Sequence, residues 1–244
     1  MYFPKIDYPF WLNVWNQSVG LKSTYSNMHS RIFLHFQGDI MTCENEINRL
    51  IDAVGLDYSS AENRKTVETV IDLIYAWGGP SGRMFYFDRK GKSSPRIQIM
   101  ETANFKRYFK GIELAMQSNP LAVETFQSIP GIGSSFASKH AFFWSKSAPK
   151  RLIIIDSKIA GALGYVNLQD LFVHHEYTKV LIEFSHKSED YFGTNDASNI
   201  ERALFAFHNN YFLNNNKSMR LNPKISKDFE EAFKLFDLMR ISNH

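Results

Sequence analysis

The sequence predicts a mainly α-helical protein, and three observations lead to that class. Apolar residues recur at spacings of three and four over most of the chain, as on the buried stripe of a helix. Glycine and proline interrupt this pattern at a few points, where helices are expected to end. The chain has 244 residues, of which 44% are hydrophobic. It can therefore bury a core as one bilobed domain or as two small domains.

The clearest helical period lies in residues 45–54, where Ile47, Leu50, Ile51 and Val54 share one stripe. The same period predicts six further helices. These are 67–77, 104–117, 122–128, 134–146, 196–212 and 226–239. Residues 78–80, Gly-Gly-Pro, are expected to end the second of the seven.

Cys43 is the only cysteine, which excludes internal disulfides, a four-cysteine iron–sulfur cluster and a zinc ribbon. The apolar opening carries Lys5 and Asp7 and has no small-residue cleavage site, so a signal peptide is not expected. No apolar run approaches the roughly 18 residues of a membrane helix. A cytoplasmic protein without a membrane partner is expected, and we expect it to be a monomer.

A mild positive charge permits a polyanionic partner without requiring one, since the net charge is +3. The positive side chains are densest in the region 80–96, which reads as a glycine-punctuated loop or short hairpin. They are Arg83, Arg89, Lys90, Lys92 and Arg96. The region is interpreted either as a solvated surface loop or as a loop that contacts phosphates, with Arg83 and Arg89 as the candidate contacts.

A Pro-Gly-Ile-Gly turn separates the predicted helices 122–128 and 134–146. Gly131 and Gly133 let the backbone come very close to a ligand, and their amides add to the positive end of the following helix. Ser134 or Ser135 is expected to cap that helix. A DNA phosphate suits such a site better than a small metabolite, because no nucleotide-binding P-loop is nearby.

Asp156 lies 23 positions after Gly133, between the apolar run Leu-Ile-Ile-Ile and the segment Ser-Lys-Ile-Ala-Gly-Ala-Leu. The apolar run is expected to be buried, so it delivers the carboxylate to the start of a short helix. Two interpretations remain open at this point. Asp156 is a helix N-cap, or it is the central carboxylate of an active site.

This arrangement resembles the helix-hairpin-helix superfamily of DNA glycosylases, with a hairpin of the Pro-Gly-Ile-Gly type and an essential aspartate about twenty residues downstream. The phrasing is most similar to bacterial proteins described as oxoguanine-glycosylase-like. The resemblance implies a bilobed helical glycosylase fold with a cleft between the lobes. Residues 1–57 with 151–244 would form the terminal lobe, and residues 58–150 the inserted lobe, which ends in the helix-hairpin-helix at 129–146.

The resemblance also implies roles for single residues. Gly131 and Gly133 match glycines that grip the DNA backbone, in some relatives with a monovalent cation at the hairpin carbonyls; no other cofactor is implied. Asp156 matches the catalytic carboxylate. Lys158 matches a residue that touches the phosphate near the flipped nucleotide. The implied partner is double-stranded DNA with a damaged or modified base.

Ser135 departs from the pattern of the bifunctional relatives, which also cut the strand. They carry a lysine nucleophile at this position, and serine cannot form an imine. Lys139 lies one helical turn further on and is the candidate for a displaced nucleophile. The plainer interpretation of Lys139 is a solvated or phosphate-facing helix lysine.

The base pocket is expected to contain Glu201 and Phe205 by weak resemblance, with Trp77 as a stacking candidate. The plainer interpretation is a surface glutamate beside a core phenylalanine, and core packing for Trp77. His174, His175 and Glu176 suggest a metal at first sight. Adjacent histidines on a helix point in different directions and no third ligand has suitable spacing, so no metal site is predicted.

The expected activity is hydrolysis of the N-glycosidic bond of a base flipped out of DNA, through Asp156. The substrate is either an oxidised or alkylated base, as in repair, or a bulky modified cytosine such as glycosylated hydroxymethylcytosine, as in defence against phage. Two alternatives stay open. One is a lyase that uses Lys139, and the other is a non-catalytic DNA-binding protein that has kept the hairpin.

Overall fold

The structure is a computed structural model, and it describes residues 3–28, 36–88, 93–163, 165, 171 and 176–213. For Met28 and residues 211–213 it describes the backbone only. The described α-helices are α1 (Tyr8–Val14), α2 (Tyr25–Met28), α3 (Ile40–Val54), α4 (Arg64–Trp77), α5 (Pro95–Met100), α6 (Thr102–Met116), α7 (Leu121–Gln127), α8 (Ser134–Trp144), α9 (Ser157–Ala162), α10 (Glu176–Phe192) and α11 (Ser198–Leu213). A π-helical turn covers Trp15–Val19 and a 3-10 helix covers Gly79–Phe85.

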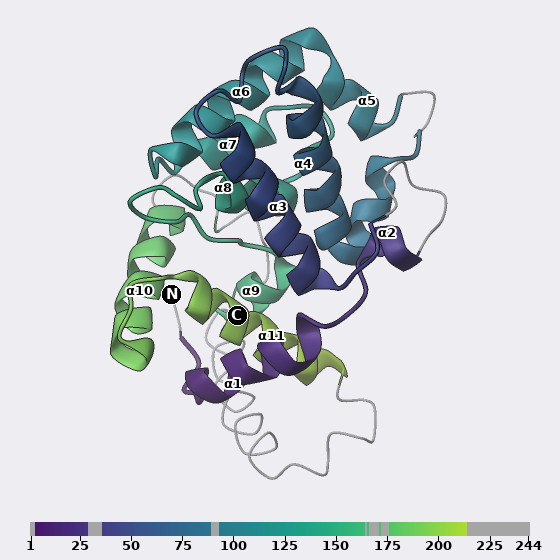
Figure 1. The fold of residues 1–244 in the computed structure, drawn as a ribbon. Helices are drawn as coiled ribbons and strands as arrows, with labels where there is room; N and C mark the ends of the chain where they lie inside the picture. The colour runs from purple at the N-terminus through teal and green to yellow at the C-terminus, as the bar shows by residue number, and fades with distance from the viewer. Residues whose placement is uncertain are drawn as a thin grey trace, which may run out of the picture. The chain divides into compact units, whose positions relative to one another are not determined.

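The described residues are mainly helical, which confirms the predicted class (Figure 1). Their β structure is limited to one isolated antiparallel bridge between Ser23 and Asp39. Most predicted helices lie within a few residues of the observed ones, and α4 ends at Gly78 as expected. The predicted helix 226–239 lies outside the described residues.

The chain divides into two compact units. One unit contains Met1–Gln17 and Ile155–His244, and the other contains Ser18–Ile154. The division places residues 18–57 and 151–154 with the middle of the chain, whereas the predicted lobes place them with the two ends. The physical reason is that α3 packs along α4, so the two helices share one core (Figure 1).

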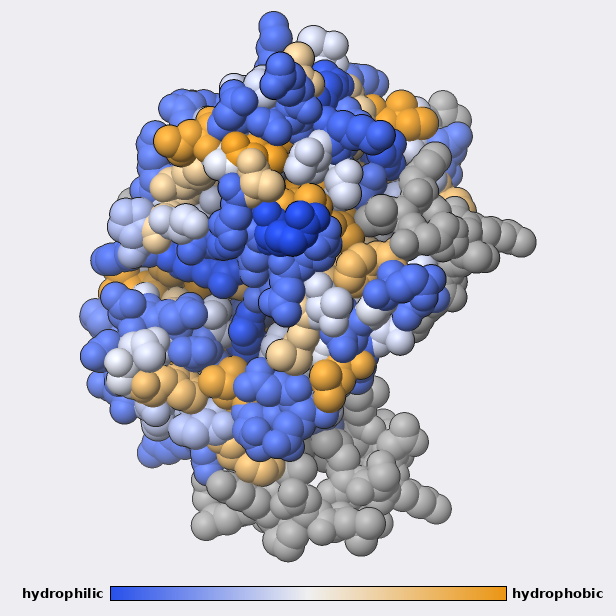
Figure 2. All heavy atoms as spheres, in the orientation of Figure 1, coloured by the Kyte–Doolittle hydropathy of each residue, from blue (hydrophilic) through white to orange (hydrophobic). Residues whose placement is uncertain are grey.

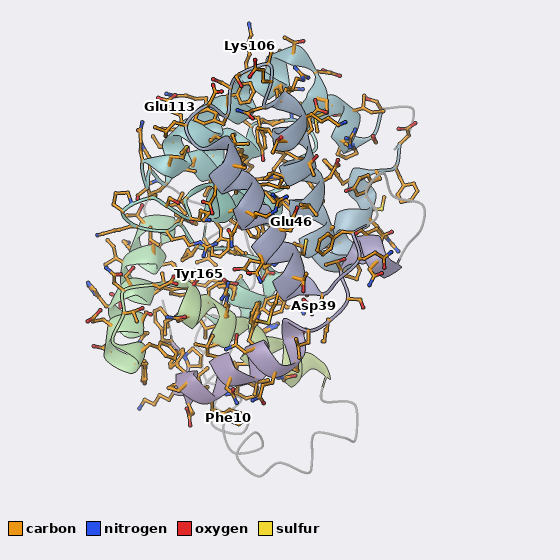
Figure 3. All side chains as sticks on the ribbon, viewed as in Figure 1. Phe10, Asp39, Glu46, Lys106, Glu113 and Tyr165 are labelled. Carbon is orange, nitrogen blue, oxygen red and sulfur yellow. The ribbon has the colours of Figure 1, made fainter. Side chains whose placement is uncertain are left out.

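In the middle unit α3 begins at Asp39, whose side chain accepts a hydrogen bond from the amide of Thr42, as an N-cap does (Figure 3). Ile47 and Ile51 of α3 are buried with Val70 of α4. The ammonium of Lys146, just after α8, lies 2.6 Å from a carboxylate oxygen of Asp52 in α3. This unit therefore has its own apolar core.

Helices α6, α7 and α8 pack on one another in the same unit. Side chains such as Lys106 and Glu113 lie on the outer side of α6 (Figure 3), while Tyr108 is fully buried. Figure 2 shows hydrophilic residues over much of the surface that faces the viewer, with apolar residues scattered among them. The polar and apolar sides of the amphipathic helices thus match the predicted periodicity.

The unit made from the two chain ends is centred on α11, which packs against α1, α9 and α10. Trp11 of α1 meets Phe207 of α11 edge to face, with 5.4 Å between the ring centroids. The guanidinium carbon of Arg202 lies 4.6 Å from the ring centroid of Trp15. These contacts hold the start of the chain on α11 and leave another side of α11 for α9.

Candidate functional site

The turn between α7 and α8 is pinned by two isoleucines. Ile129 and Ile132 are buried, and the amide of Ile132 donates to the carbonyl of Ile129 over 3.0 Å. Pro130, Gly131 and Gly133 are exposed between and beside them. The apolar residues therefore hold the turn in the core and present its glycines at the surface.

Gly131 occupies a place that only glycine fits. Its φ is +92°, a conformation that other residues rarely adopt, and an added Cβ would lie 2.6 Å from Cβ of Pro95. Its carbonyl accepts a hydrogen bond from the hydroxyl of Tyr75 over 3.3 Å. The turn is thus held by a hydrogen bond from the buried side chain of Tyr75, and it packs against Pro95, the first residue of α5.

Gly133 differs from Gly131 in that it has an ordinary extended backbone, with φ −79° and ψ 163°, and open space around it. It is the N-cap residue of α8, and no side chain caps this helix. The expectation that Ser134 or Ser135 caps it is therefore wrong. Both serines lie inside the helix, and the Oγ of buried Ser134 accepts a hydrogen bond from Gln127 over 2.9 Å. The open backbone at Gly133 leaves room for an anion to approach the start of α8.

Lys139 is buried rather than solvated, with only 5% of its surface exposed. Its ammonium reaches back one turn and donates to Oγ of Ser135 over 2.9 Å, and it lies 5.3 Å from the ring centroid of Phe136. An amine on residue 139 is thus delivered to the neighbourhood of residue 135. The solvated alternative for this lysine is wrong, because the side chain folds along the helix instead of extending into water.

Tyr75 lies between two parallel rings. Its ring centroid is 3.5 Å from that of Phe85 and 4.2 Å from that of Phe136, with interplanar angles of 5° and 14°. The stack joins α4, the 3-10 helix and α8. Because the same tyrosine bonds to the carbonyl of Gly131, the turn is tied to three elements of the core.

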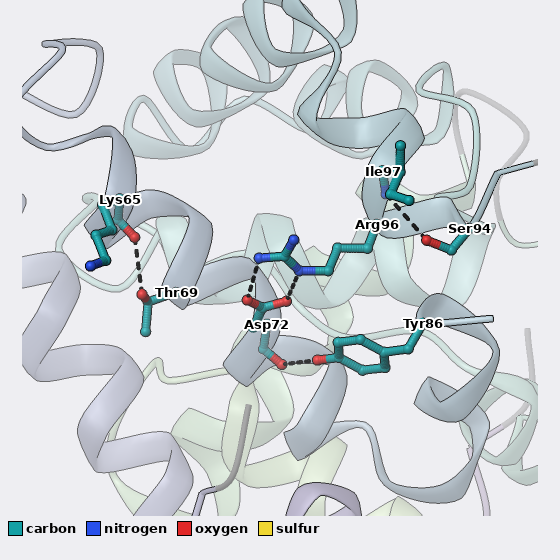
Figure 4. Close-up of polar contacts among 7 residues, drawn as sticks. All are labelled: Lys65, Thr69, Asp72, Tyr86, Ser94, Arg96 and Ile97. Atoms are coloured by element: carbon teal, nitrogen blue, oxygen red, sulfur yellow. Dashed lines mark hydrogen bonds and ion pairs between the residues drawn. The ribbon is translucent and has the colours of Figure 1, made fainter. Parts of the chain in front are cut away.

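The basic region divides into parts with different surroundings. Arg83 is exposed in the last turn of the 3-10 helix Gly79–Phe85, and Arg89 lies outside the described residues. Arg96 belongs to α5 and forms an ion pair with Asp72 of α4, close to the bond that the Tyr86 hydroxyl makes to the carbonyl of Asp72 (Figure 4). Arg96 was counted with the basic loop, but its charge is already partnered inside the unit.

Trp77 lies on α4 in the middle unit and packs edge to face on Phe143, with 5.3 Å between the ring centroids. The side chain is half-buried, and its indole nitrogen is buried without a hydrogen-bond partner. Core packing therefore accounts for its position, and an unsatisfied donor remains on its edge.

Asp156 is the N-cap of α9. One carboxylate oxygen, Oδ1, accepts hydrogen bonds from the amides of Lys158 and Ile159, over 2.9 and 3.1 Å. Residues 152–155 before it are buried, as predicted, and the side chain of Asp156 is half-buried. The cap interpretation is confirmed. The two amide bonds also hold the carboxylate in one orientation, as a catalytic group requires.

Lys158 lies against α11 rather than pointing into water. Its ammonium donates a hydrogen bond to Oδ1 of Asn209 and lies 4.6 Å from the ring centroid of Phe205. Phe205 and Asn209 are four residues apart and so share one face of α11. Lys158 and Phe205 are both predicted site residues, and the structure places them in contact next to Asp156. Asn209 was not predicted as a site residue.

Glu201 lies one turn before Phe205 on α11 and is buried, with 3% of its surface exposed, while Phe205 is half-buried. The plainer prediction of a surface glutamate is therefore wrong. A buried carboxylate at this place is unusual for a residue without a structural or chemical role.

His208 completes this group of side chains. A Cβ added to Gly161 of α9 would clash with the imidazole of His208, so the absence of a side chain there lets this ring lie against α9. Burial lowers the pKa of His208 to about 4; the charge of Asp156 opposes this shift and that of Lys158 adds to it. The imidazole is therefore neutral at pH 7. Neither His208 nor Asn209 carries a local sequence signal other than its spacing from Phe205.

The contacts between α9 and α11 thus assemble a candidate site within one unit, which we call the α9–α11 cluster. Its members are Asp156, Lys158, Glu201, Phe205, His208 and Asn209. Together they offer a fixed carboxylate, a held ammonium, a half-buried aromatic ring, a neutral imidazole and an amide. The turn 129–133 is a second candidate site, in the other unit.

Of the three residues suggestive of a metal, His174 and His175 lie outside the described part of the chain. Glu176 is bonded to Lys179 at 2.7 Å and to the hydroxyl of Tyr165 at 3.3 Å. Within the described ranges no three histidine, cysteine, aspartate or glutamate side chains gather as metal ligands would. Likewise, none of the described helices is long and apolar enough to cross a lipid bilayer.

Comparison with known proteins adds no assignment. No protein-family model, no curated protein and no solved structure matches this chain. The geometry of the α9–α11 cluster and of the turn 129–133 is therefore the basis for a functional proposal, together with the sequence resemblance described above.

Proposed function

We propose that this protein is a DNA N-glycosylase that flips a damaged or modified base out of the double helix and hydrolyses its N-glycosidic bond. The proposal includes the bilobed glycosylase fold, with a helix-hairpin-helix at residues 129–146 and a cleft between the lobes, that the resemblance implies. One observation carries the proposal. Asp156 follows a buried run and is held in one orientation by two amides of α9, beside Lys158 and one face of α11.

The chemistry requires a carboxylate of this kind. As the bond between the base and C1′ breaks, its electron pair leaves with the base and positive charge develops on the sugar. An ionised Asp156 near C1′ stabilises that charge and accepts a proton from the attacking water. The water oxygen forms the new bond to C1′, and the departing base takes up a proton.

DNA binding is assigned to the turn 129–133 and to Lys158. Gly133 has open space around its backbone at the start of α8, where the amides and the helix dipole favour a phosphate. Arg83 is exposed and adds a positive charge in the same unit. The partner is double-stranded DNA with a modified base, and flipping that base costs a few kcal/mol that these contacts must offset.

The base is either oxidised or alkylated, or a bulky modified cytosine such as glycosylated hydroxymethylcytosine, the form expected of a phage-defence enzyme. Glu201 would accept a hydrogen bond from an exocyclic amine and Phe205 would stack on the base. The neutral imidazole of His208 adds a polar group on the helix face that carries Glu201 and Phe205, which suits a substrate that carries a sugar.

The direct test is to incubate the protein with DNA duplexes that carry a panel of damaged and phage-type bases, and to detect free base by mass spectrometry. Release that disappears in Asp156→Asn supports the proposal, because asparagine keeps a cap oxygen but not the charge. Asp196→Asn is the matched control, since Asp196 likewise accepts an amide bond at the start of a helix in the same unit. Equal release from wild type and Asp156→Asn would refute the mechanism.

Two observations favour alternatives. The ammonium of Lys139 lies at Ser135, the position at which the bifunctional glycosylases carry their lysine nucleophile. Formation of an imine with an abasic sugar is therefore the second candidate activity. Borohydride trapping on abasic DNA tests it, and an adduct that persists in Lys139→Ala would exclude this lysine. The third candidate is a non-catalytic DNA-binding protein, in which Asp156 serves only as the cap of α9. DNA binding without base release across the panel would favour it.

A further inference from the structure

We infer that Asn209 is a positioning residue, which together with the ring of Phe205 holds the ammonium of Lys158 where it contacts a DNA phosphate beside Asp156. The inference deepens the proposed glycosylase function and rests on it. Asn209 does not touch the substrate in this account. It acts through Lys158.

Two side chains on one face of α11 hold the ammonium of Lys158. Phe205 and Asn209 are one turn apart, so both face α9, and the ammonium of Lys158 meets both of them. Asn209 is buried and Lys158 is half-buried. A lysine side chain on a surface normally samples many rotamers, and two contacts to a rigid helix remove most of that freedom.

The group of Asn209 that accepts the hydrogen bond from Lys158 is an amide oxygen. An amide oxygen is neutral, so it fixes the ammonium without cancelling its charge, and the ring of Phe205 attracts the cation through its face. An aspartate at position 209 would hold the lysine more strongly but would neutralise it. Asn209 therefore positions the ammonium without adding a negative charge of its own.

The imidazole of His208 lies near the charges of Lys158 and Asp156. The charge of Lys158 lowers the pKa of His208 and that of Asp156 raises it, so both α9 charges lie close enough to act on this imidazole. The pKa of His208 therefore depends on the position of the Lys158 ammonium. If Asn209 holds Lys158, releasing the lysine must change the titration of His208 in the same direction as removing the lysine.

The first experiment measures that titration by NMR in the free protein, with the His208 signal assigned from a His208→Gln variant. Lys158→Met is expected to raise the pKa of His208, and Asn209→Ala to raise it as well. Asn210→Ala is the matched control, because Asn210 is equally buried and its side-chain nitrogen has no hydrogen-bond partner. An unchanged His208 titration in Asn209→Ala, with a shift in Lys158→Met, would overturn the positioning role.

The second experiment measures binding to a short duplex with a tetrahydrofuran abasic-site analogue over a series of KCl concentrations. Loss of one phosphate contact lowers the slope of log K against log salt by about 0.9. We expect that loss in Lys158→Met and in Asn209→Ala, and no further loss in the double variant, since both changes remove the same contact. Additive losses in the double variant, or a wild-type slope in Lys158→Met, would overturn the inference.

The two experiments separate this inference from the proposed function. A protein that binds the duplex with the expected slopes but releases no base from any substrate contradicts glycosylase catalysis and leaves Asn209 as a positioning residue for DNA binding. A protein that releases base while Asn209→Ala changes neither His208 nor the salt slope keeps its proposed function and loses this inference.

Discussion

The guanidinium of Arg96 donates two hydrogen bonds to the carboxylate of Asp72, from Nε over 2.7 Å and from Nη2 over 3.0 Å. Asp72 is buried in α4, and the pair connects that helix to the start of α5 (Figure 4). Pro95, the residue before Arg96, is the one against which Gly131 packs. The ion pair therefore supports the turn 129–133 from a distance.

Arg96→Ala is expected to destabilise the protein by about 3 kcal/mol at pH 7, because it leaves the buried carboxylate of Asp72 without its partner. Burial raises the pKa of Asp72, and the bonds from Arg96 oppose that rise. Without Arg96 the folded protein takes up a proton at Asp72 more easily as the pH falls. The loss measured by urea unfolding should thus be smaller at acid pH than at pH 7, and a loss independent of pH would contradict this account.

Asp156→Ala and Asp156→Asn separate the two roles of the carboxylate. Alanine removes the acceptor for two amides of α9 and should cost about 1 kcal/mol of unfolding free energy. Asparagine keeps an oxygen in the same place, so its loss should be a few tenths of a kcal/mol. Thermal unfolding of the two variants checks this, and equal losses would show that the cap bonds contribute little to stability.

Gly131→Ala and Gly133→Ala form a matched pair in one turn. At Gly131 the positive φ and the contact with Pro95 should make alanine costly, at about 1–3 kcal/mol. At Gly133 the backbone is ordinary and the space is open, so alanine should change stability by less than about 0.5 kcal/mol. DNA affinity should nevertheless fall in Gly133→Ala, since the added methyl group lies where a phosphate would approach. Wild-type affinity in a stable Gly133→Ala protein would argue against a phosphate there.

His140 makes the middle unit sensitive to acid. Trp144 donates to the Tyr108 hydroxyl over 3.0 Å, and that hydroxyl bonds to Nδ1 of His140 over 2.8 Å. Burial lowers the pKa of His140 to about 3. The folded state thus keeps the ring neutral while the unfolded state binds a proton below about pH 6.5, so stability falls as the pH falls.

The expected contribution of His140 to this fall is up to about 1.4 kcal/mol per pH unit between about pH 6.5 and 3. His140→Gln should reduce the slope by that amount, since glutamine does not titrate. Urea unfolding of both proteins over this range provides the measurement. Parallel pH profiles would show that His140 is not the neutral buried group described here.

Tyr75→Phe should keep the ring stack with Phe85 and Phe136 and lose only the bond to the carbonyl of Gly131. The expected cost is about 0.5–1.5 kcal/mol. Because that bond ties the turn to the core, hydrogen exchange at residues 131–133 should become faster while exchange in α4 stays unchanged. A uniform change over the whole unit would instead indicate general destabilisation.

The sequence allowed the helices to be predicted because their periodicity is local. The end of α4 at Gly78 and the cap at Asp156 also depend on a few adjacent residues. The Asp72–Arg96 pair could not be predicted in this way, since it joins residues 24 positions apart. For the same reason the local sequence groups Arg96 with the basic loop, although its guanidinium is bonded to Asp72.

The candidate site was predicted in part. Lys158 and Phe205 were selected separately, and nothing local indicated that they would be in contact. Asn209 is 51 positions from Lys158, and its role depends on how α9 lies on α11. Burial of Lys139 and Glu201 likewise depends on neighbouring elements, so the alternative of an exposed side chain is wrong for both residues.

The packing of α1 against α11 has a consequence for the order of events during translation. Residues 18–154 form a unit whose sequence is complete before α11 is synthesised, so this unit can fold while the ribosome is still extending the chain. Trp11 and Trp15 are synthesised before this unit, whereas their partners Phe207 and Arg202 are synthesised after it. Two apolar indole side chains thus lack these native contacts while residues 18–154 are synthesised and fold.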